Sequence, residues 1–309
     1  LLLLVLIGLR FFNRWVTLVA FGWMSVSPMD LAIAQRAWQD GVLALVALLL
    51  VYVCAEISYK RRRVSWFILL GVLGSFCVLI KETGIIIYGL CIIWVLWVTF
   101  VKEKSLGRSL FVIIFSLCSI GISIFLISKA CGGFLNVTDA IRHNIGSLTR
   151  SEYALIYNSG PWFRILQGFF FLSPVAAILS LVGIIGIILP GKGENAFLGR
   201  RRVILGIIFF TLSFTVISLF PQNLRNLRFF SVVFIPFYLM AGTGSYYIVR
   251  FLKGRVRAPL FYLGAAAIIL GISAAGFFDY QNFKALFVVK ETPDLAVKLL
   301  IEHSLYNFF

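Results

Sequence analysis

The chain has 309 residues, a mean hydropathy of +1.00 and a hydrophobic content of 61%. These values exclude an ordinary soluble domain and indicate a membrane protein, because a helix needs roughly 20 apolar residues to cross a bilayer. The formal net charge of +16 is compatible with nucleic acid, but the basic residues stand in short segments beside apolar stretches, with no basic arm. That distribution favours anionic lipid as their partner and argues against nucleic acid.

Nine apolar stretches are candidates for full membrane helices, and residues 1–9 resemble the second half of another. The nine stretches cover about 15–34, 41–57, 64–80, 84–100, 110–127, 165–189, 203–220, 229–249 and 259–277. They are continuous rather than alternating, which favours helices over a barrel. The sequence predicts an all-α, polytopic transmembrane bundle over residues 1–277 and a short extracytoplasmic tail over 278–309. Because the chain starts at Leu1 without Met or a polar lead-in, we expect a further helix and loop before it.

Clusters of Lys and Arg occupy every second gap between the apolar stretches. The clusters are Arg10/Arg14, 60–63, Lys102/Lys104/Arg108, Lys192 with 200–202, and Arg250/Lys253/Arg255/Arg257. Cytoplasmic loops are enriched in Lys and Arg, so these gaps are predicted to be cytoplasmic. The opposite gaps then face outward, at about 27–40, 81–83, 128–164, 221–228 and 278–309.

The five cysteines show no metal-binding or disulfide pattern. Four of them lie inside predicted helices, where Cys packs as a small hydrophobe, and no CxxC or Cys/His spacing is present. The sequence therefore predicts neither a zinc site nor a disulfide framework.

The first charged group on the predicted outer face contains Asp30, Arg36 and Asp40. A solvated turn with a local Arg–Asp pair and helix capping by Asp40 accounts for it without any function. Ionisable residues at membrane depth are costly, however, and often mark functional sites. Composition favours the solvated turn, and both interpretations stay open.

The second group is Lys81-Glu82, between two wholly apolar flanks. A salt-bridged tight turn is one interpretation. The other is a Lys ammonium held at the lipid boundary to meet a phosphate. The sequence does not separate the two.

The third group contains Arg225 and Arg228, which stand three residues apart among Gln and Asn side chains. On a helix they would share one face, and the Arg fork suits phosphate oxygens. Interfacial anchoring by snorkelling is the alternative.

The fourth group lies in the long outer segment and ends with Trp162 and Arg164 after a Gly-Pro turn. Trp suits the membrane interface. His143 in the same segment is a candidate base, although a lone His is more often a surface residue. The four groups together suit a ligand with an anionic head and a lipid tail, such as a polyprenyl-phosphate sugar.

Four segments carry a resemblance to a known family. The first segment resembles the "P…R…x-x-D-x-x-L" segment of the dolichyl-phosphate-mannose–protein mannosyltransferase group; it consists of Ser27-Pro28 and Arg36-Ala37-Trp38-Gln39-Asp40-Gly41. That group includes bacterial family 39 glycosyltransferases and the aminoarabinose transferases of lipid A. Residues 71–79 followed by Lys81 are similar to the family's "G-l-x-x-G-l-x-x-l-x-K" helix. The other two segments are Ser159-Gly160-Pro161-Trp162-Phe163-Arg164 with Leu172-Ser173-Pro174, and Arg228-Phe229-Phe230 through Pro236 and Ala241-Gly242. Arg225 has no firm counterpart.

The resemblance implies a GT-C fold and inverting transfer of a sugar from a polyprenyl-phosphate donor on the extracytoplasmic face. We expect Lys81 and Arg228 to bind the lipid phosphate, together with Arg225, for which the family offers no counterpart. The resemblance places Arg36, Asp40, Glu82, Trp162 and Arg164 around the cavity. The family's general base lies in the first outer loop, which is expected before Leu1, so no catalytic residue is assigned. The donor sugar is the only small molecule implied. The absence of a large insert between helices favours a bacterial inner membrane over the endoplasmic reticulum.

Two other functions remain open. A glycosyltransferase-like scaffold without its acid would be an accessory subunit of a membrane complex. A lipid flippase or transporter would gather polar groups near the midplane, whereas here they gather at one face.

Overall fold

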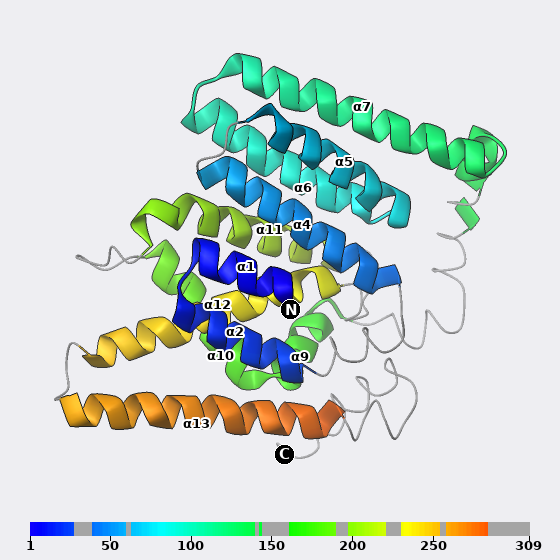
Figure 1. The fold of residues 1–309 in the computed structure, drawn as a ribbon. Coiled ribbons are helices and arrows are strands. Elements are labelled where there is room, and N and C mark those ends of the chain that lie inside the picture. Colours follow the sequence, from blue (N-terminus) through cyan, green and yellow to red (C-terminus); the bar gives the residue numbers. More distant parts are fainter. Residues whose placement is uncertain are drawn as a thin grey trace. The chain divides into compact units, whose positions relative to one another are not determined.

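The computed structural model describes residues 1–27, 39–59, 63–139, 142–143, 161–189, 197–220, 230–253 and 258–283. Every regular element within these ranges is a helix (Figure 1), which confirms the all-α prediction. The chain divides into two compact units. Unit 1 comprises Leu1–Ala37, Pro161–Ile208 and Asn226–Phe309, and unit 2 comprises Trp38–Gly160 and Phe209–Arg225.

Unit 2 is built from helices that pack side by side (Figure 1). They are α4 (Gln39–Tyr59), α5 (Val64–Ile80), α6 (Gly84–Leu96) with its π-helical continuation η1 (Trp97–Lys102), and α7 (Leu106–Ala130). The turn between α5 and α6 is tight, with the Gly84 amide donating to the Lys81 carbonyl at 2.8 Å. A Cβ at Gly84 would lie 1.9 Å from the Cys77 carbonyl oxygen. Glycine is therefore required at this turn.

Small and hydroxyl-bearing residues bring α5 and α7 together. Ser119 and Ser123 lie buried on the face of α7 toward α5. The Ser75 hydroxyl donates to the Ser119 carbonyl at 3.1 Å, and the Ser123 hydroxyl donates to the Ser75 carbonyl at 3.3 Å. Such contacts are typical of helix packing in membranes, where small residues permit close backbone approach.

Unit 1 packs around α10 and α12. Its elements are α1 (Leu2–Phe11), α2 (Arg14–Val26), α9 (Phe163–Leu172), α10 (Pro174–Ile188), η3 (Leu198–Arg200), α12 (Ser231–Lys253) and α13 (Ala258–Phe283). Cβ atoms built at Gly183 and Gly244 would lie 2.1 and 1.9 Å from backbone oxygens of the facing helix. The two helices thus touch backbone to backbone. The remaining helix, α11 (Arg201–Leu219), is divided between the two units.

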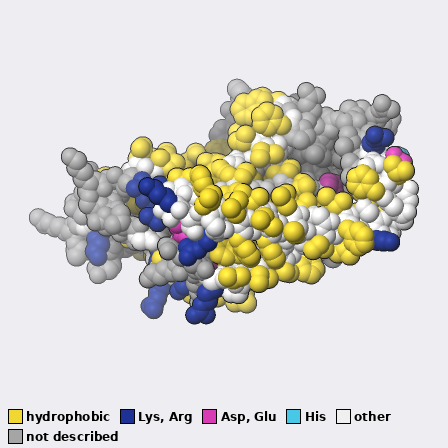
Figure 2. Space-filling model, turned by 90° about the horizontal axis from the view of Figure 1, so that it is seen from above, with side chains coloured by type: hydrophobic (Ala, Val, Ile, Leu, Met, Phe, Trp, Pro, Cys, Tyr) yellow, Lys and Arg dark blue, Asp and Glu magenta, His cyan; other side chains and the backbone are white. Residues whose placement is uncertain are grey.

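The count of nine full membrane helices is not supported by the described residues. Five helical segments are long and apolar enough to cross a membrane: Asp40–Tyr59, Gly84–Lys102, Leu106–Ala130, Arg201–Leu219 and Ser231–Lys253. Three further apolar helices are shorter: Leu2–Phe11, Val64–Ile80 and Pro174–Ile188. Hydrophobic side chains cover most of the described surface on the face drawn in Figure 2. This composition is compatible with an integral membrane protein.

Two predicted helices have different bounds in the structure. The stretch predicted over 165–189 is broken at Ser173, which separates α9 from α10. Pro174 explains the break, since proline is well placed in the first turn of a new helix but not within one. Within the stretch predicted over 15–34, α2 ends at Val26 and Ser27 takes up an extended conformation, while residues 28–34 lie outside the described residues.

Candidate functional site

The centre of the candidate site is Lys81, in the turn between α5 and α6. Its backbone is extended (φ −160°, ψ 148°) and ends α5, so the side chain leaves the helix axis at the end of an apolar element. Glu82 and Thr83 complete the turn. This turn connects α5 to a candidate membrane span that begins at Gly84, so Lys81 lies just before the start of that span.

Lys81 forms a buried ion pair with Asp40. Its Nζ donates to Asp40 Oδ1 at 2.6 Å, and the two side chains are only 8% and 7% exposed. Asp40 lies in the first turn of α4, where the helix dipole favours a carboxylate. The structure thus joins two of the predicted site residues that are far apart in sequence.

Burial makes this ion pair costly to break. Removing one partner leaves an uncompensated charge inside the protein, which costs about 3–5 kcal/mol. The pair therefore fixes the end of α5 against the start of α4. It also places opposite charges together at the ends of two apolar helices.

Glu82 does not form the tight-turn salt bridge that one interpretation of the sequence required. Its side chain is exposed, and the carboxylate bonded to Lys81 is that of Asp40. Lys81 thus pairs across helices rather than with its neighbour in sequence.

The other predicted site residues belong to unit 1 or lie outside the described residues, Glu82 and His143 excepted. Trp162 lies in unit 1 just before α9, is 57% exposed and packs edge-on against Phe163. Arg164 belongs to α9, but its side chain lies outside what is described. Arg36, Arg225 and Arg228 lie outside the described residues.

His143 is exposed and belongs to unit 2. Near it, Asp139 and Arg142 form a long, solvated ion pair of 3.9 Å. Within the described ranges no group of three His, Cys, Asp or Glu side chains is placed to hold a metal ion.

Two buried acids went unnoticed in the sequence. Glu56 is fully buried in α4 and accepts a hydrogen bond from the Tyr52 hydroxyl at 3.2 Å. Asp279 is 4% exposed and lies beyond the predicted membrane stretch that ends at 277. A carboxylate inside an apolar stretch was a visible signal for Glu56.

The residues around Asp279 explain its raised pKa. Burial raises the pKa of Asp279 to about 7, and the Ser173 hydroxyl offsets part of that rise. One turn earlier, Gly276 packs against α2, since a Cβ there would lie 3.1 Å from Val26 Cγ2. Gly276 and Asp279 are the buried positions among the described side chains of α13. Asp279 therefore lies on the face of α13 that packs against the other helices of unit 1.

Comparison with known proteins found no match to this chain, whether among protein-family models, curated proteins or solved structures.

Proposed function

We propose that this protein is a membrane glycosyltransferase, which moves a sugar from a polyprenyl-phosphate donor to an acceptor at the extracytoplasmic face. The observation that carries the proposal is the buried Lys81–Asp40 pair at the end of α5. The resemblance of the segments around these two residues to the family 39 group supports the same assignment.

In this proposal Lys81 binds the phosphate of the donor lipid. As the bond between the sugar carbon and the phosphate oxygen breaks, negative charge grows on the departing phosphate, and a fixed cation stabilises it. The acceptor oxygen forms the new bond to that carbon and gives its proton to a base that we do not assign. The sequence, not the structure, is the ground for Arg228 and Arg225 as further cations and for Arg36, Glu82, Trp162 and Arg164 as cavity residues.

Asp40 acts in this proposal as a positioning residue. A lysine side chain has a flexible four-carbon stem and loses considerable conformational entropy when it is held in one place. Asp40 already holds the ammonium in one place at 2.6 Å. The donor phosphate then meets a cation that is positioned in advance, and it shares that cation with the carboxylate.

The proposal also fixes the orientation. The Lys/Arg-rich gaps face the cytoplasm, and the turn at Lys81 faces the opposite side of a bacterial inner membrane. Shorter helices such as α5 cross with the longer ones, because a helix of about 17 residues is at the lower limit for spanning.

An accessory subunit is the second candidate function. The observation that favours it is the burial of the ion pair, since the Lys81 and Asp40 side chains are both below 10% exposed and are bonded to one another. A purely structural clamp between α4 and α5 would have this geometry. A transfer assay that separates fold from chemistry distinguishes the two.

The test is sugar transfer from a polyprenyl-phosphate donor by the full chain in proteoliposomes. We expect Lys81→Gln to lower turnover by roughly a hundredfold or more, which is the usual effect of removing one transition-state donor. Lys129→Gln is the matched control, because Lys129 is exposed at the other end of α7 from its Lys/Arg cluster and its ammonium lies 5.9 Å from the centre of the Phe125 ring. Equal turnover in the wild type and a folded Lys81→Gln variant would remove Lys81 from the chemistry.

A further inference from the structure

A second charged site lies in unit 2 at the turn between η1 and α7. Two candidate membrane spans, Gly84–Lys102 and Leu106–Ala130, meet there with only residues 103–105 between them. In a membrane protein whose chain crosses at both candidate spans, this turn lies at a membrane surface. It carries three cations, Lys102, Lys104 and Arg108, and one carboxylate, Glu103, so its net charge is 3 − 1 = +2.

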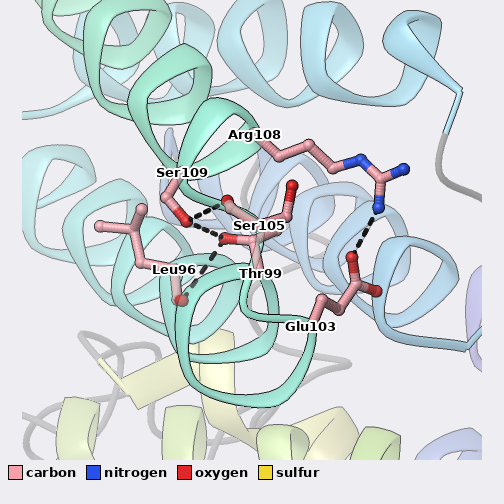
Figure 3. A network of polar contacts seen from close by, with 6 residues as sticks. All are labelled: Leu96, Thr99, Glu103, Ser105, Arg108 and Ser109. Atoms are coloured by element: carbon pink, nitrogen blue, oxygen red, sulfur yellow. Dashed lines mark hydrogen bonds and ion pairs between the residues drawn. The ribbon is translucent and has the colours of Figure 1, made fainter.

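Hydrogen bonds close this turn into a defined shape (Figure 3). The Ser109 hydroxyl donates to the Ser105 carbonyl at 3.0 Å. The Ser105 amide donates to the Thr99 carbonyl, also at 3.0 Å. The hydroxyls of Thr99 and Ser109 are 3.1 Å apart and buried. The π-helical turn adds a bond from the Glu103 amide to the Val98 carbonyl at 3.0 Å. The backbone that carries the cations is thus fixed before any ligand arrives.

The carboxylate of this turn is turned inward and the cations outward. Glu103 Oε2 accepts from an Arg108 terminal nitrogen at 2.8 Å, with the Glu103 side chain 10% exposed and that of Arg108 41% exposed. In Figure 3 the second terminal nitrogen of Arg108 is directed away from Glu103. Arg108 therefore still offers donors to a ligand outside the turn.

Lys102 and Lys104 are both exposed, and the structure positions each of them. The Lys102 ammonium lies 5.1 Å from the centre of the Trp97 ring, an arrangement that restrains a cation without neutralising it. Lys104 has a φ of 53°, in the left-handed region that residues with a side chain rarely adopt. Such strain tends to persist at functional positions.

Exposed apolar residues stand beside the cations in the sequence. Phe100, Val101 and Leu106 are 57%, 52% and 61% exposed, on the elements that enter the bilayer. A partner for this surface must present an anionic group beside hydrocarbon. Free phosphate and nucleic acid lack the hydrocarbon, whereas an anionic phospholipid has both parts.

We propose that the turn from Trp97 to Arg108 is a binding site for the phosphate of an anionic phospholipid headgroup. Lys102, Lys104 and Arg108 contact the phosphate, and the exposed apolar residues contact the acyl chains. This inference is independent of the proposed transferase activity, because it concerns the opposite end of α6 and requires no reaction.

The test uses the purified full chain in a zwitterionic detergent and measures lipid binding by native mass spectrometry. The probes are phosphatidylglycerol, phosphatidylcholine and inorganic phosphate. We expect phosphatidylglycerol to bind and the other two not to bind. Each surface charge is expected to contribute about fivefold in affinity, so Lys102→Gln with Lys104→Gln should weaken binding roughly thirtyfold.

Two control variants separate the loss of a charge at this turn from backbone strain and from loss of charge elsewhere. Lys104→Gly removes the charge while relieving the left-handed backbone, so weaker binding by that variant cannot come from strain. Lys129→Gln makes the same charge change at the other end of α7, beside the Phe125 ring at 5.9 Å, and should leave binding unchanged. The proposal is overturned by equal binding of both phospholipids, by equal losses in the Lys129→Gln variant, or by inorganic phosphate displacing the lipid.

Discussion

Two ion pairs of unit 2, Lys81–Asp40 and Arg108–Glu103, stand at opposite ends of α6 and differ in almost every physical respect. Lys81 and Asp40 come from different helices, lie 2.6 Å apart and are 8% and 7% exposed. Arg108 and Glu103 come from one short turn, lie 2.8 Å apart, and the Arg108 side chain is 41% exposed. The first pair is shielded from water, whereas the second is partly open to it. Similar distances thus describe a costly buried clamp and a weak surface contact, and burial decides which is which.

The largest expected effect is on the buried pair. Lys81→Gln or Asp40→Asn should lower the free energy of unfolding by about 3–5 kcal/mol, because each leaves one buried charge without its partner. The measurement is reversible unfolding of the full chain in mixed micelles. The exchanged variant, Asp40→Lys with Lys81→Asp, should recover most of the loss. A loss below about 1 kcal/mol would mean that the pair behaves like a surface contact.

The turn that presents Lys81 gives the next effect. Gly84→Ala should destabilise the chain by about 1–3 kcal/mol or more, since the new Cβ would lie 1.9 Å from the Cys77 carbonyl oxygen. Gly89→Ala is the matched control, because no heavy atom lies within 4 Å of a Cβ at that position of the same helix. The control should be neutral or stabilising. If both variants unfold at the same denaturant concentration, the close approach at the turn is absent.

Asp279 sharpens the comparison, because it is a buried acid that has no ion pair with any described residue. Its pKa is raised from 3.8 to about 7, so the folded state holds a proton that the unfolded chain has released. The stabilising contribution is complete below pH 3.8 and is lost as pH rises to about 7. Unfolding titrations over this range should show falling stability that flattens in Asp279→Asn. An identical pH dependence in the variant would assign it to other groups.

The smallest effect is expected at the exposed pair. Glu103→Gln should change the free energy of unfolding by less than about 1 kcal/mol, since solvent screens the Arg108 charge. It should also raise the affinity for phosphatidylglycerol, because it removes the only carboxylate of the turn. The combination of unchanged stability and tighter lipid binding is specific to this turn. Weaker lipid binding would contradict the proposed headgroup site.

The all-helical architecture could be predicted from the sequence, because long and continuous apolar stretches favour helices. The stretch predicted over 64–80 has the same bounds as α5. The stretch predicted over 165–189 was wrong because an apolar stretch does not reveal where a backbone breaks. In that stretch the Ser173-Pro174 dipeptide ends α9 and begins α10, although the residues on both sides of it are apolar.

The candidate site was accessible only in part. Asp40 and Lys81 were each placed at the outer ends of their helices, but no local pattern says that residues 41 positions apart are bonded. A salt-bridged turn at Lys81-Glu82 was one of two open interpretations of the sequence, and the structure pairs Lys81 with Asp40. Asp279 was assigned to a tail, because its burial depends on contacts of α13 with α2 and α12 that local sequence does not encode.

The measurement that tests the central claim most directly is sugar transfer by the exchanged variant, Asp40→Lys with Lys81→Asp, in proteoliposomes. The exchange retains the ion pair but moves the cation from the α5–α6 turn to α4. We predict a folded protein of near-normal stability that has lost transfer from the polyprenyl-phosphate donor. Transfer at the wild-type rate in that variant would contradict the account and leave the pair as a clamp between two helices.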